Sequence, residues 1–286
     1  MSNEAPELLW TPDPHGVGDT AIASFTRFVN KHHGEQIADT DYAALHAWSV
    51  RDVAEFWSAA AEFLGVLFHH QPSAALGSTS MPGAQWFPGA TLNYAEHVLS
   101  VGPGRADDDT AVIFVREDGL QRTITHAELR DQVARARAGL VRLGVGRGDR
   151  VVALAPNSPE TLVMFLAAAS LGAIWSSCSP DFGARAVADR FGQIEPVVLL
   201  AVDGYRYGGK SIDILPTVRA LRAQLPTVRA TVLLPYLETD ARMDGTLAWS
   251  DFTGEAGALE FDALPFDHPL WVLYSSGTTG LPKAIV

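Results

Sequence analysis

The stretch that determines the fold class is Val151–Ser176, VVALAPNSPETLVMFLAAASLGAIWS. It opens with a short apolar run, continues through Ser158-Pro159-Glu160, and reaches a second apolar run after Leu171-Gly172. Proline is favoured at the first position of a helix, and a short continuous apolar run is typical of a buried strand. The order strand, helix, strand is therefore predicted, and a parallel strand pair needs such a crossover helix.

The same alternation extends on both sides of this stretch. Upstream, residues 111–115 predict a strand, and Thr125 with Glu128 form a capping-box pattern at the start of a helix. Downstream, a helix through Ile194 precedes a strand over residues 197–202. We therefore predict an α/β fold, with helices packed on a largely parallel sheet. Ligands of such folds bind beyond the carboxyl ends of the strands.

The first hundred residues follow a different pattern, with helical apolar spacing and many aromatic residues. A helix is predicted between Thr20 and Gly34, and a second one after Ser49 and Asp52, whose spacing resembles a capping box. Its apolar stripe continues to Leu67. We accordingly divide the chain into a helical, aromatic-rich N-terminal region, residues 1–105, and an α/β region, residues 106–286.

Composition and charge limit the classes of partner. The 286 residues are 47% hydrophobic, which is enough for a packed core. Acidic residues outnumber Lys and Arg by 33 to 21, for a formal charge of −12, which argues against nucleic acid or an anionic membrane as partner. An anion-binding site must then be local.

Cysteine usage and the first residues bear on the compartment. The single cysteine, Cys178, argues against an internal disulfide and a cysteine-rich metal site and fits a reducing compartment. His32-His33 and His69-His70 lack acidic partners at ligand spacing, so we predict solvated surface for them and no metal site. The start, MSNEAPELLW, carries acids where a signal peptide has a basic region, and no apolar run is long enough to span a membrane. We expect a cytoplasmic protein; the oligomeric state is not encoded in these features.

The stretch that bears most on function is YSSGTTGLPK, Tyr274–Lys283, which follows an apolar run. Glycine allows close approach of the backbone to a ligand, successive N–H groups bind anions, and hydroxyl side chains add donors. Lys283 supplies a positive charge. These properties favour a loop that wraps a phosphate chain, over the alternative of an ordinary polar turn.

The spacing differs from that of the common nucleotide loop G-x-x-x-x-G-K-[ST], in which the lysine follows the second glycine and opens a helix. Here Leu281 and Pro282 intervene, and proline disfavours helical geometry in the residue before it. The following Ala-Ile-Val is typical of a strand. We therefore predict strand, loop, strand, without the helix dipole that a helix N-terminus would supply.

YSSGTTGLPK resembles the phosphate loop of the adenylate-forming superfamily, which contains acyl-CoA synthetases, luciferases and adenylation domains of peptide synthetases. Further stretches are similar to the acetoacetyl-CoA synthetases within it, and the resemblance runs from about Trp10 to Val286. These stretches are LHAWSV at 45–50, WFPGATLNYAEHVL at 86–99, SSCSPDFG at 176–183 and RFGQIEP at 190–196.

The resemblance implies that residues 106–286 are the start of the AMP-binding domain of an acid–thiol ligase of lipid and ketone-body metabolism. Its implied chemistry has two steps. Acetoacetate first attacks the α-phosphate of ATP, with Mg²⁺, giving acetoacetyl-AMP and pyrophosphate. The thiol of coenzyme A then displaces AMP.

The resemblance also implies site residues. It assigns Lys283 to catalysis, through the charge that develops at the phosphates, and it names no metal ligand in this chain. The residues that it assigns to the ATP phosphates are Ser275, Ser276, Gly277, Thr278, Thr279 and Gly280. The residues that it suggests for the phosphates of coenzyme A, with a plain surface turn as an equal alternative, are Tyr207, Gly208, Gly209 and Lys210.

Two positions depart from the commonest superfamily string: Ser275 stands where many members have Thr, and Ala284 where many have Gly. Both keep the side chain small. Cys178 lacks a nucleophile's context, so we predict a small buried cysteine. The resemblance gives no role for Trp175 or Asp181.

Three alternatives remain. The chain could belong to a synthetase for acetate or propionate, to a kinase-like hydrolase, or to a non-catalytic nucleotide-binding fragment. The acyl pocket and the small C-terminal domain of adenylate-forming enzymes have no counterpart in these residues. We therefore expect the N-terminal part of a longer enzyme, inactive alone.

Overall fold

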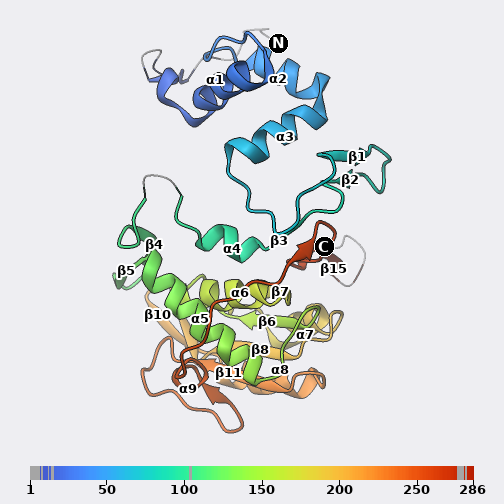
Figure 1. Ribbon diagram of the computed structural model, residues 1–286. Helices are drawn as coiled ribbons and strands as arrows, with labels where there is room; N and C mark the ends of the chain where they lie inside the picture. Colours follow the sequence, from blue (N-terminus) through green and yellow to red (C-terminus); the bar gives the residue numbers. More distant parts are fainter. Residues whose placement is uncertain are drawn as a thin grey trace, which may run out of the picture. The chain divides into compact units, whose positions relative to one another are not determined.

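The computed structural model describes residues 7, 9–11, 13, 16–102, 105–275, 280 and 282–286 (Figure 1). The chain divides into two compact units, Met1–Thr91 and Leu92–Val286. The functional boundary proposed near residue 105 stays a prediction.

The N-terminal unit is helical, as its apolar spacing predicts. Thr20 caps the first helix by accepting a hydrogen bond from the backbone N–H of Ala23, and Gly34 ends it in a left-handed conformation with φ 73°. The unit also contains a short antiparallel strand pair. Its elements are the 3-10 turn Val17–Asp19, the helices Ala21–His33 (α1), Tyr42–Arg51 (α2) and Val53–Phe63 (α3), and the strands Leu76–Ser78 (β1) and Gln85–Trp86 (β2).

The capping box predicted at Ser49 and Asp52 is wrong. Ser49 lies inside α2, and the N-cap of α3 is Asp52, whose carboxylate accepts from the N–H of Glu55. Two helices join at Asp52, so a cap three residues earlier falls within the preceding helix. The helix also ends at Phe63, earlier than the stripe to Leu67 suggests.

The predicted solvated surface is also wrong for His33. Its Nδ1 lies 3.0 Å from Glu55 Oε1, and its ring packs at 6.3 Å from that of Trp48, which is 1% exposed. The reason is that the aromatic core of this unit includes the last turn of α1. Among the residues that the structure describes, no cluster of three His, Cys, Asp or Glu residues could hold a metal ion.

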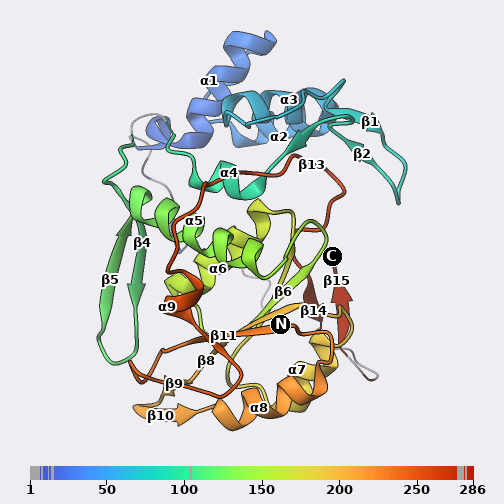
Figure 2. The same ribbon diagram turned by 60° about the horizontal axis from the view of Figure 1, so that its bottom comes forward.

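The second unit is built on a five-stranded sheet in the order β12-β11-β8-β6-β7 (Figure 2). Every pairing within it is parallel. The α/β fold predicted from the sequence is therefore confirmed. The strands are Arg150–Leu154 (β6), Ile174–Cys178 (β7), Val198–Val202 (β8), Ala230–Leu234 (β11) and Leu247–Ala248 (β12).

Helices cover both faces of this sheet, with α5 and α6 on one face and α7 and α8 on the other (Figures 1 and 2). Both predicted caps form: Thr125 and Glu128 make a capping box on α5, and Ser158 caps α6 with Pro159 at its start. The helices are Tyr94–Leu99 (α4), His126–Arg142 (α5), Pro159–Ser170 (α6), Ala184–Phe191 (α7), Leu215–Gln224 (α8) and Trp249–Phe252 (α9).

Outside the five-stranded sheet, the described residues of this part of the chain form three hairpins and two further short strands, β3 and β13. Three pairs are antiparallel: β4 with β5, β9 with β10, and β14 with β15. The strands are Thr91–Leu92 (β3), Thr110–Val115 (β4), Gln121–Thr125 (β5), Gly204–Tyr207 (β9), Lys210–Asp213 (β10), Leu264–Pro265 (β13), Leu273–Ser275 (β14) and Lys283–Ile285 (β15).

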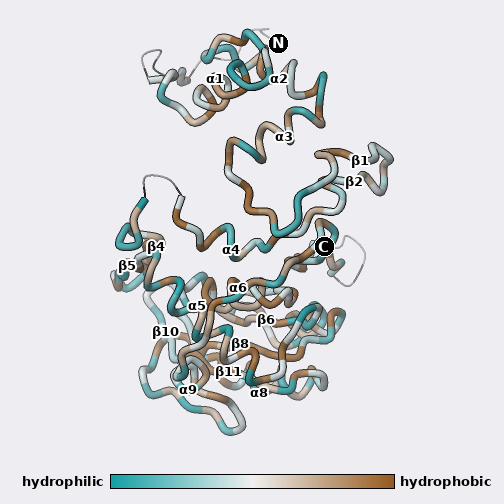
Figure 3. Tube along the Cα trace, in the orientation of Figure 1, coloured by the Kyte–Doolittle hydropathy of each residue, from teal (hydrophilic) through white to brown (hydrophobic). Residues whose placement is uncertain are grey.

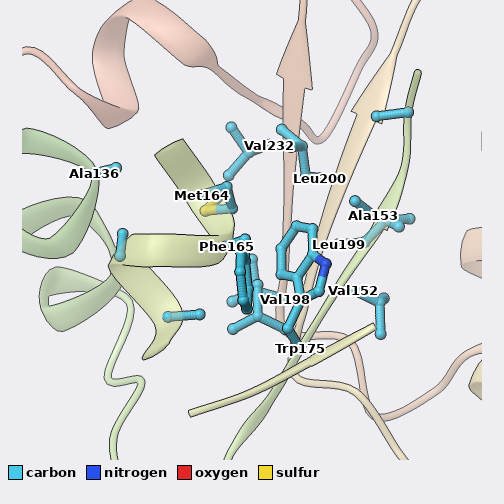
Figure 4. Packing of buried hydrophobic residues seen from close by; sticks show 14 of the residues in the cluster. Ala136, Val152, Ala153, Met164, Phe165, Trp175, Val198, Leu199, Leu200 and Val232 are labelled. Carbon is cyan, nitrogen blue, oxygen red and sulfur yellow. The ribbon is translucent and has the colours of Figure 1, made fainter. Parts of the chain in front are cut away.

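The core of the second unit lies on both faces of the sheet, under α7 and α8 on one side and under α5 and α6 on the other. Figure 4 shows the part between α5, α6 and the sheet. Met164 and Trp175 are at most 1% exposed, and the central strands are drawn largely in the hydrophobic colour in Figure 3. Burying one such large side chain stabilises the folded state by about 1.5–3 kcal/mol relative to leaving it exposed. The sheet is thus a rigid platform for the loops at its carboxyl edge.

Candidate functional site

The predicted phosphate loop joins two paired strands. β14 and β15 run antiparallel, and Ser275 lies opposite Lys283. The prediction of strand, loop, strand is therefore confirmed. Gly280 has φ 135°, a conformation that favours glycine. Ser276, Gly277, Thr278 and Thr279, which the sequence assigns to the ATP phosphates, lie outside the described residues.

The strand that leads into this loop is attached to the edge of the sheet. Trp175 N–H donates to the Leu270 carbonyl at 3.0 Å, and Val272 N–H donates to the Trp175 carbonyl at 2.8 Å. The bridge between Trp175 and Trp271 is parallel, and Ser176 Oγ donates to the Val272 carbonyl at 2.7 Å. The chain therefore enters the loop at the carboxyl edge of the sheet, where ligands of parallel sheets bind.

A polar cleft of about 640 Å³ lies at the same edge. Its walls are the segments that follow β6 and β7, the β9–β10 hairpin, and Tyr236 after β11. Two residues discussed from the sequence line it: Asp181, for which the resemblance gives no role, and Cys178, which is predicted to be a buried cysteine. The lining residues are Ala155, Pro156, Asn157, Ser177, Cys178, Ser179, Pro180, Asp181, Tyr205, Arg206, Tyr207 and Tyr236.

The residues suggested for coenzyme A form the tip of the β9–β10 hairpin. Tyr207 pairs with Lys210, and between them Gly208 and Gly209 have φ values of 58° and 74°. Two successive positive φ values are those of a tight hairpin turn, which explains the two glycines. Tyr207 is 73% exposed and borders the cleft. Their assignment to coenzyme A stays a prediction.

A carboxylate already binds the backbone of this tip. Gly209 N–H donates to Glu117 Oε1 at 2.6 Å, although the two residues are 92 positions apart. Glu117 belongs to the turn between β4 and β5. The amide group can therefore bind an anionic oxygen, which is the property that a phosphate site needs. The sequence gives no local signal for this contact.

The neighbouring residues of the same turn form an ion-pair network. Arg116 Nε and Nη2 donate to the two oxygens of Asp118, each at 2.8 Å, and Arg206 Nε lies 3.1 Å from Asp118 Oδ2. The hydrogen bonds from Arg116 lower the pKa of Asp118 to about 2. Arg116 Nη1 also donates to the Tyr236 carbonyl at 2.6 Å. The network joins the β4–β5 turn to two walls of the cleft.

Cys178 is a buried thiol rather than a nucleophile. It is 6% exposed, and burial raises its pKa to about 11, against a smaller opposite effect of Arg190. A thiol with that pKa is protonated at neutral pH. The prediction of a small buried cysteine is confirmed.

Tyr274, immediately before the loop, is held in similar surroundings. Burial raises the pKa of its hydroxyl, while Ser176 and Arg190 lower it to a smaller extent. Ser176 donates its own proton to Val272, and the Tyr274 hydroxyl meets no hydrogen-bonding partner of suitable geometry among the described residues. Its aromatic ring packs on the main core.

A second, apolar cleft of about 450 Å³ was not predicted from the sequence. Phe165 lines it and packs against three other aromatic side chains, with ring centroids 4.8 Å from Trp271, 5.9 Å from Trp175 and 5.7 Å from Tyr94. Trp175 thus packs in an aromatic group. Asn157 and Ser177 line both this apolar cleft and the polar cleft. The lining residues are Tyr94, Val112, Ile113, Phe114, Asn157, Ser158, Pro159, Thr161, Leu162, Phe165, Trp175, Ser177 and Trp271.

Magnesium has no protein ligand set in the described part of the chain, since no suitable cluster occurs there. No chemical step is therefore assigned to Mg²⁺ through these residues. Within the same residues, no helix has the length and apolar character needed to cross a bilayer.

Comparison with known proteins extends this picture. The model for AMP-binding enzymes matches residues 102–286, and the model for the acetyl-coenzyme A synthetase N-terminus matches residues 42–98. The acetoacetyl-coenzyme A synthetase of Rhizobium meliloti (strain 1021) is 42% identical over 99% of this chain and 43% of its own length. The malonamoyl-CoA synthetase vrtB of Penicillium aethiopicum is 35% identical over 98% of this chain and 40% of its own.

The solved structure of acetoacetyl-CoA synthetase from Streptomyces lividans has a TM-score of 0.92 and 51% identity. The match covers 98% of this chain and 43% of that one. The chain thus spans less than half the length of the relatives that it matches. The resemblance stated from the sequence motifs is confirmed.

Proposed function

The chain belongs to the family of AMP-binding enzymes, and from this premise we propose that the protein ligates acetoacetate to coenzyme A with ATP, through acetoacetyl-AMP. The products are AMP, pyrophosphate and acetoacetyl-CoA. The observation that carries the proposal is the position of β14, the strand that leads into the predicted phosphate loop, at the carboxyl edge of a parallel sheet. Relatives with this sequence pattern bear the name of that reaction.

In the first step, the acid's carboxylate oxygen attacks the α-phosphorus, and the bond to the pyrophosphate oxygen breaks. Negative charge gathers on the leaving pyrophosphate. Donors that already point at that charge lower the barrier. We assign this role to Ser275, Gly280 and Lys283, together with the loop residues Ser276, Gly277, Thr278 and Thr279 between them.

In the second step, the sulfur of coenzyme A attacks the acyl carbon and AMP leaves. Coenzyme A carries phosphates, which need cations and free N–H groups at the protein surface. The tip formed by Tyr207, Gly208, Gly209 and Lys210 lies beside the polar cleft and offers a cation, Lys210, and the Gly209 N–H, which a phosphate would take over from Glu117. We assign it to these phosphates.

The relatives' names narrow the class of acid. One is named for acetoacetyl-CoA and another for malonamoyl-CoA. Both acyl groups are short and carry a carbonyl group at the third carbon. We propose that the acid must have this carbonyl group, which distinguishes it from a plain alkanoic acid.

One observation favours a second candidate. Residues 42–98 match the N-terminal model of acetyl-coenzyme A synthetases, so acetate or propionate is the alternative acid. The two candidate acids can be distinguished on the full-length protein. The assay measures how each acid supports the exchange of pyrophosphate into ATP. We expect exchange with acetoacetate at least about tenfold above that with acetate or propionate, in kcat/KM. A preference for acetate would establish the second candidate.

The third candidate is a nucleotide-binding fragment without catalysis. The relatives are more than twice as long, so we propose that residues 1–286 alone release no pyrophosphate. Sustained acetoacetate-dependent release by this segment would contradict that proposal. We further propose that the protein acts in the cytoplasm on small molecules.

A further inference from the structure

The segment RFGQIEP, Arg190–Pro196, has no role in the chemistry described above, yet it contacts the phosphate-loop hairpin. Gln193 Nε2 donates one hydrogen bond to the Asp189 carbonyl at 2.7 Å and another to the Pro282 carbonyl at 2.9 Å. A primary amide has two N–H donors, and both are used here. The side chain thus links the end of α7 to the residue that precedes Lys283. Figures 1 and 2 show α7 beside this hairpin.

The turn that carries Gln193 is fixed to the sheet. Arg150, the first residue of β6, donates from Nε to the Ile194 carbonyl at 2.6 Å and from Nη2 to the Glu195 carbonyl at 2.8 Å. Glu195 has φ 50°, an unusual conformation that such contacts maintain. A rigid strand therefore positions the Gln193 side chain.

The two ends of the phosphate loop are held in different ways. The β14 end is hydrogen-bonded to β7 through Val272 and Ser176. The β15 end is paired with β14 and exposed, and Gln193 connects it to the body of the domain at Pro282. A loop that must hold a cation near a phosphate needs both ends fixed, because small displacements reduce the rate strongly.

We infer that Gln193 is a positioning residue for the adenylation step: it fixes the exit of the phosphate loop and, through Pro282, the place of Lys283. The inference rests on the proposed function. Gln193 touches no substrate in this role. It acts on the step at phosphate and leaves the acid and the thiol unaffected.

The test compares side chains at position 193 of the full-length protein. Gln193→Met keeps the length but removes both donors, and Gln193→Lys restores a donor. Loss of a hydrogen bond of this kind is expected to lower kcat of acetoacetate-dependent pyrophosphate exchange about three- to tenfold. The KM for acetoacetate and the rate of thiol attack on supplied acetoacetyl-AMP should not change. Gln193→Lys should return kcat to within about twofold of wild type.

The chain offers a matched control. Gln224 Nε2 donates to the Ala220 carbonyl at 3.1 Å, four residues earlier in the chain, which is the spacing of the bond from Gln193 to Asp189. Gln224 is the last residue of α8. Gln224→Met should leave the exchange rate unchanged. An equal loss in this control, or a wild-type rate in Gln193→Met, would overturn the inference, as would failure of Gln193→Lys to restore the rate.

A second measurement keeps the test independent of the acid. Hydrogen–deuterium exchange at the amides of residues 283–285 should be faster in Gln193→Met than in wild type and in Gln224→Met. If the hydrogen–deuterium exchange of these amides is the same in Gln193→Met as in wild type, the inference is overturned, whatever the kinetics show. Absence of pyrophosphate exchange in wild type with every acid would instead contradict the proposed function, and the amide measurement would then decide on Gln193 alone.

Discussion

Two hairpins with glycines and a lysine stand at the carboxyl side of the sheet, and they hold their shape by different means. In β9–β10, two residues with positive φ join paired strands, so the turn itself shapes the tip, and Glu117 and Asp118 only add contacts from outside. In β14–β15, residues 276–282 separate Ser275 from Lys283, and the contacts to Trp175, Ser176 and Gln193 come from outside the hairpin.

This difference indicates which kind of ligand group each hairpin can bind. A tight turn presents a few fixed amides to one phosphate group at the surface. A long loop can surround a chain of phosphates, but it depends on the domain to hold its ends. In both hairpins a lysine opens the second strand: Lys210 in β10 and Lys283 in β15. The two lysines therefore allow the proposed roles to be separated.

The largest effect is expected for Lys283→Ala in the full-length protein. Loss of a charge that acts on the phosphates during the reaction should slow adenylation about a hundredfold. The KM for acetoacetate should stay within about twofold. Single-turnover formation of acetoacetyl-AMP measures both quantities, and an equal loss in acid binding would refute the assignment.

Lys210→Ala should affect the other half-reaction. Removal of a charge-assisted contact at an exposed position is expected to raise the KM for coenzyme A about tenfold. Pyrophosphate exchange, which needs no coenzyme A, should stay at the wild-type rate. If exchange falls while the KM for coenzyme A holds, the roles assigned to the two hairpins are reversed.

Glu117→Gln should have a smaller effect of opposite sign. The Glu117 carboxylate accepts the hydrogen bond from Gly209 N–H, so it repels a phosphate and competes with it for the same donor. Its replacement by a neutral amide should lower the KM for coenzyme A about threefold, as steady-state kinetics would show. A higher KM would mean that Glu117 supports the tip instead of competing with the ligand.

The smallest effect concerns stability at low pH. Arg116 lowers the pKa of Asp118 from 3.8 to about 2, so the folded state favours the ionised form. The pair's contribution to the free energy of unfolding is therefore present above pH about 4 and is lost as the pH falls toward 2. Urea unfolding of Asp118→Asn should therefore depend less on pH between 2 and 4 than that of wild type. An identical pH dependence would show that the exposed pair contributes nothing.

Local patterns were enough to predict the sheet, the caps of α5 and α6, and the hairpin at YSSGTTGLPK. Each depends on residues close in sequence: Pro159 at a helix start, Thr125 with Glu128, and glycines after an apolar run. Local patterns failed at Ser49, since they do not say where one helix ends and the next begins.

Long-range contacts could not be predicted in this way. Glu117 meets Gly209 across 92 residues, and Gln193 meets Pro282 across 89. Such pairs are decided by the order of strands in the sheet, which sequence periodicity does not specify. The same holds for the apolar cleft, whose aromatic residues come from five separate segments of the chain.

The two clefts share Asn157 and Ser177, so a polar space and an apolar one adjoin at these two residues. A substitution at either residue therefore changes both clefts at once. Substitutions that share a neighbour are not additive. A library that varies the lining of one cleft alone would mainly give substitutions that do not fit the unchanged lining of the other. Joint variation of both linings around Asn157 and Ser177 allows compensating pairs to be selected.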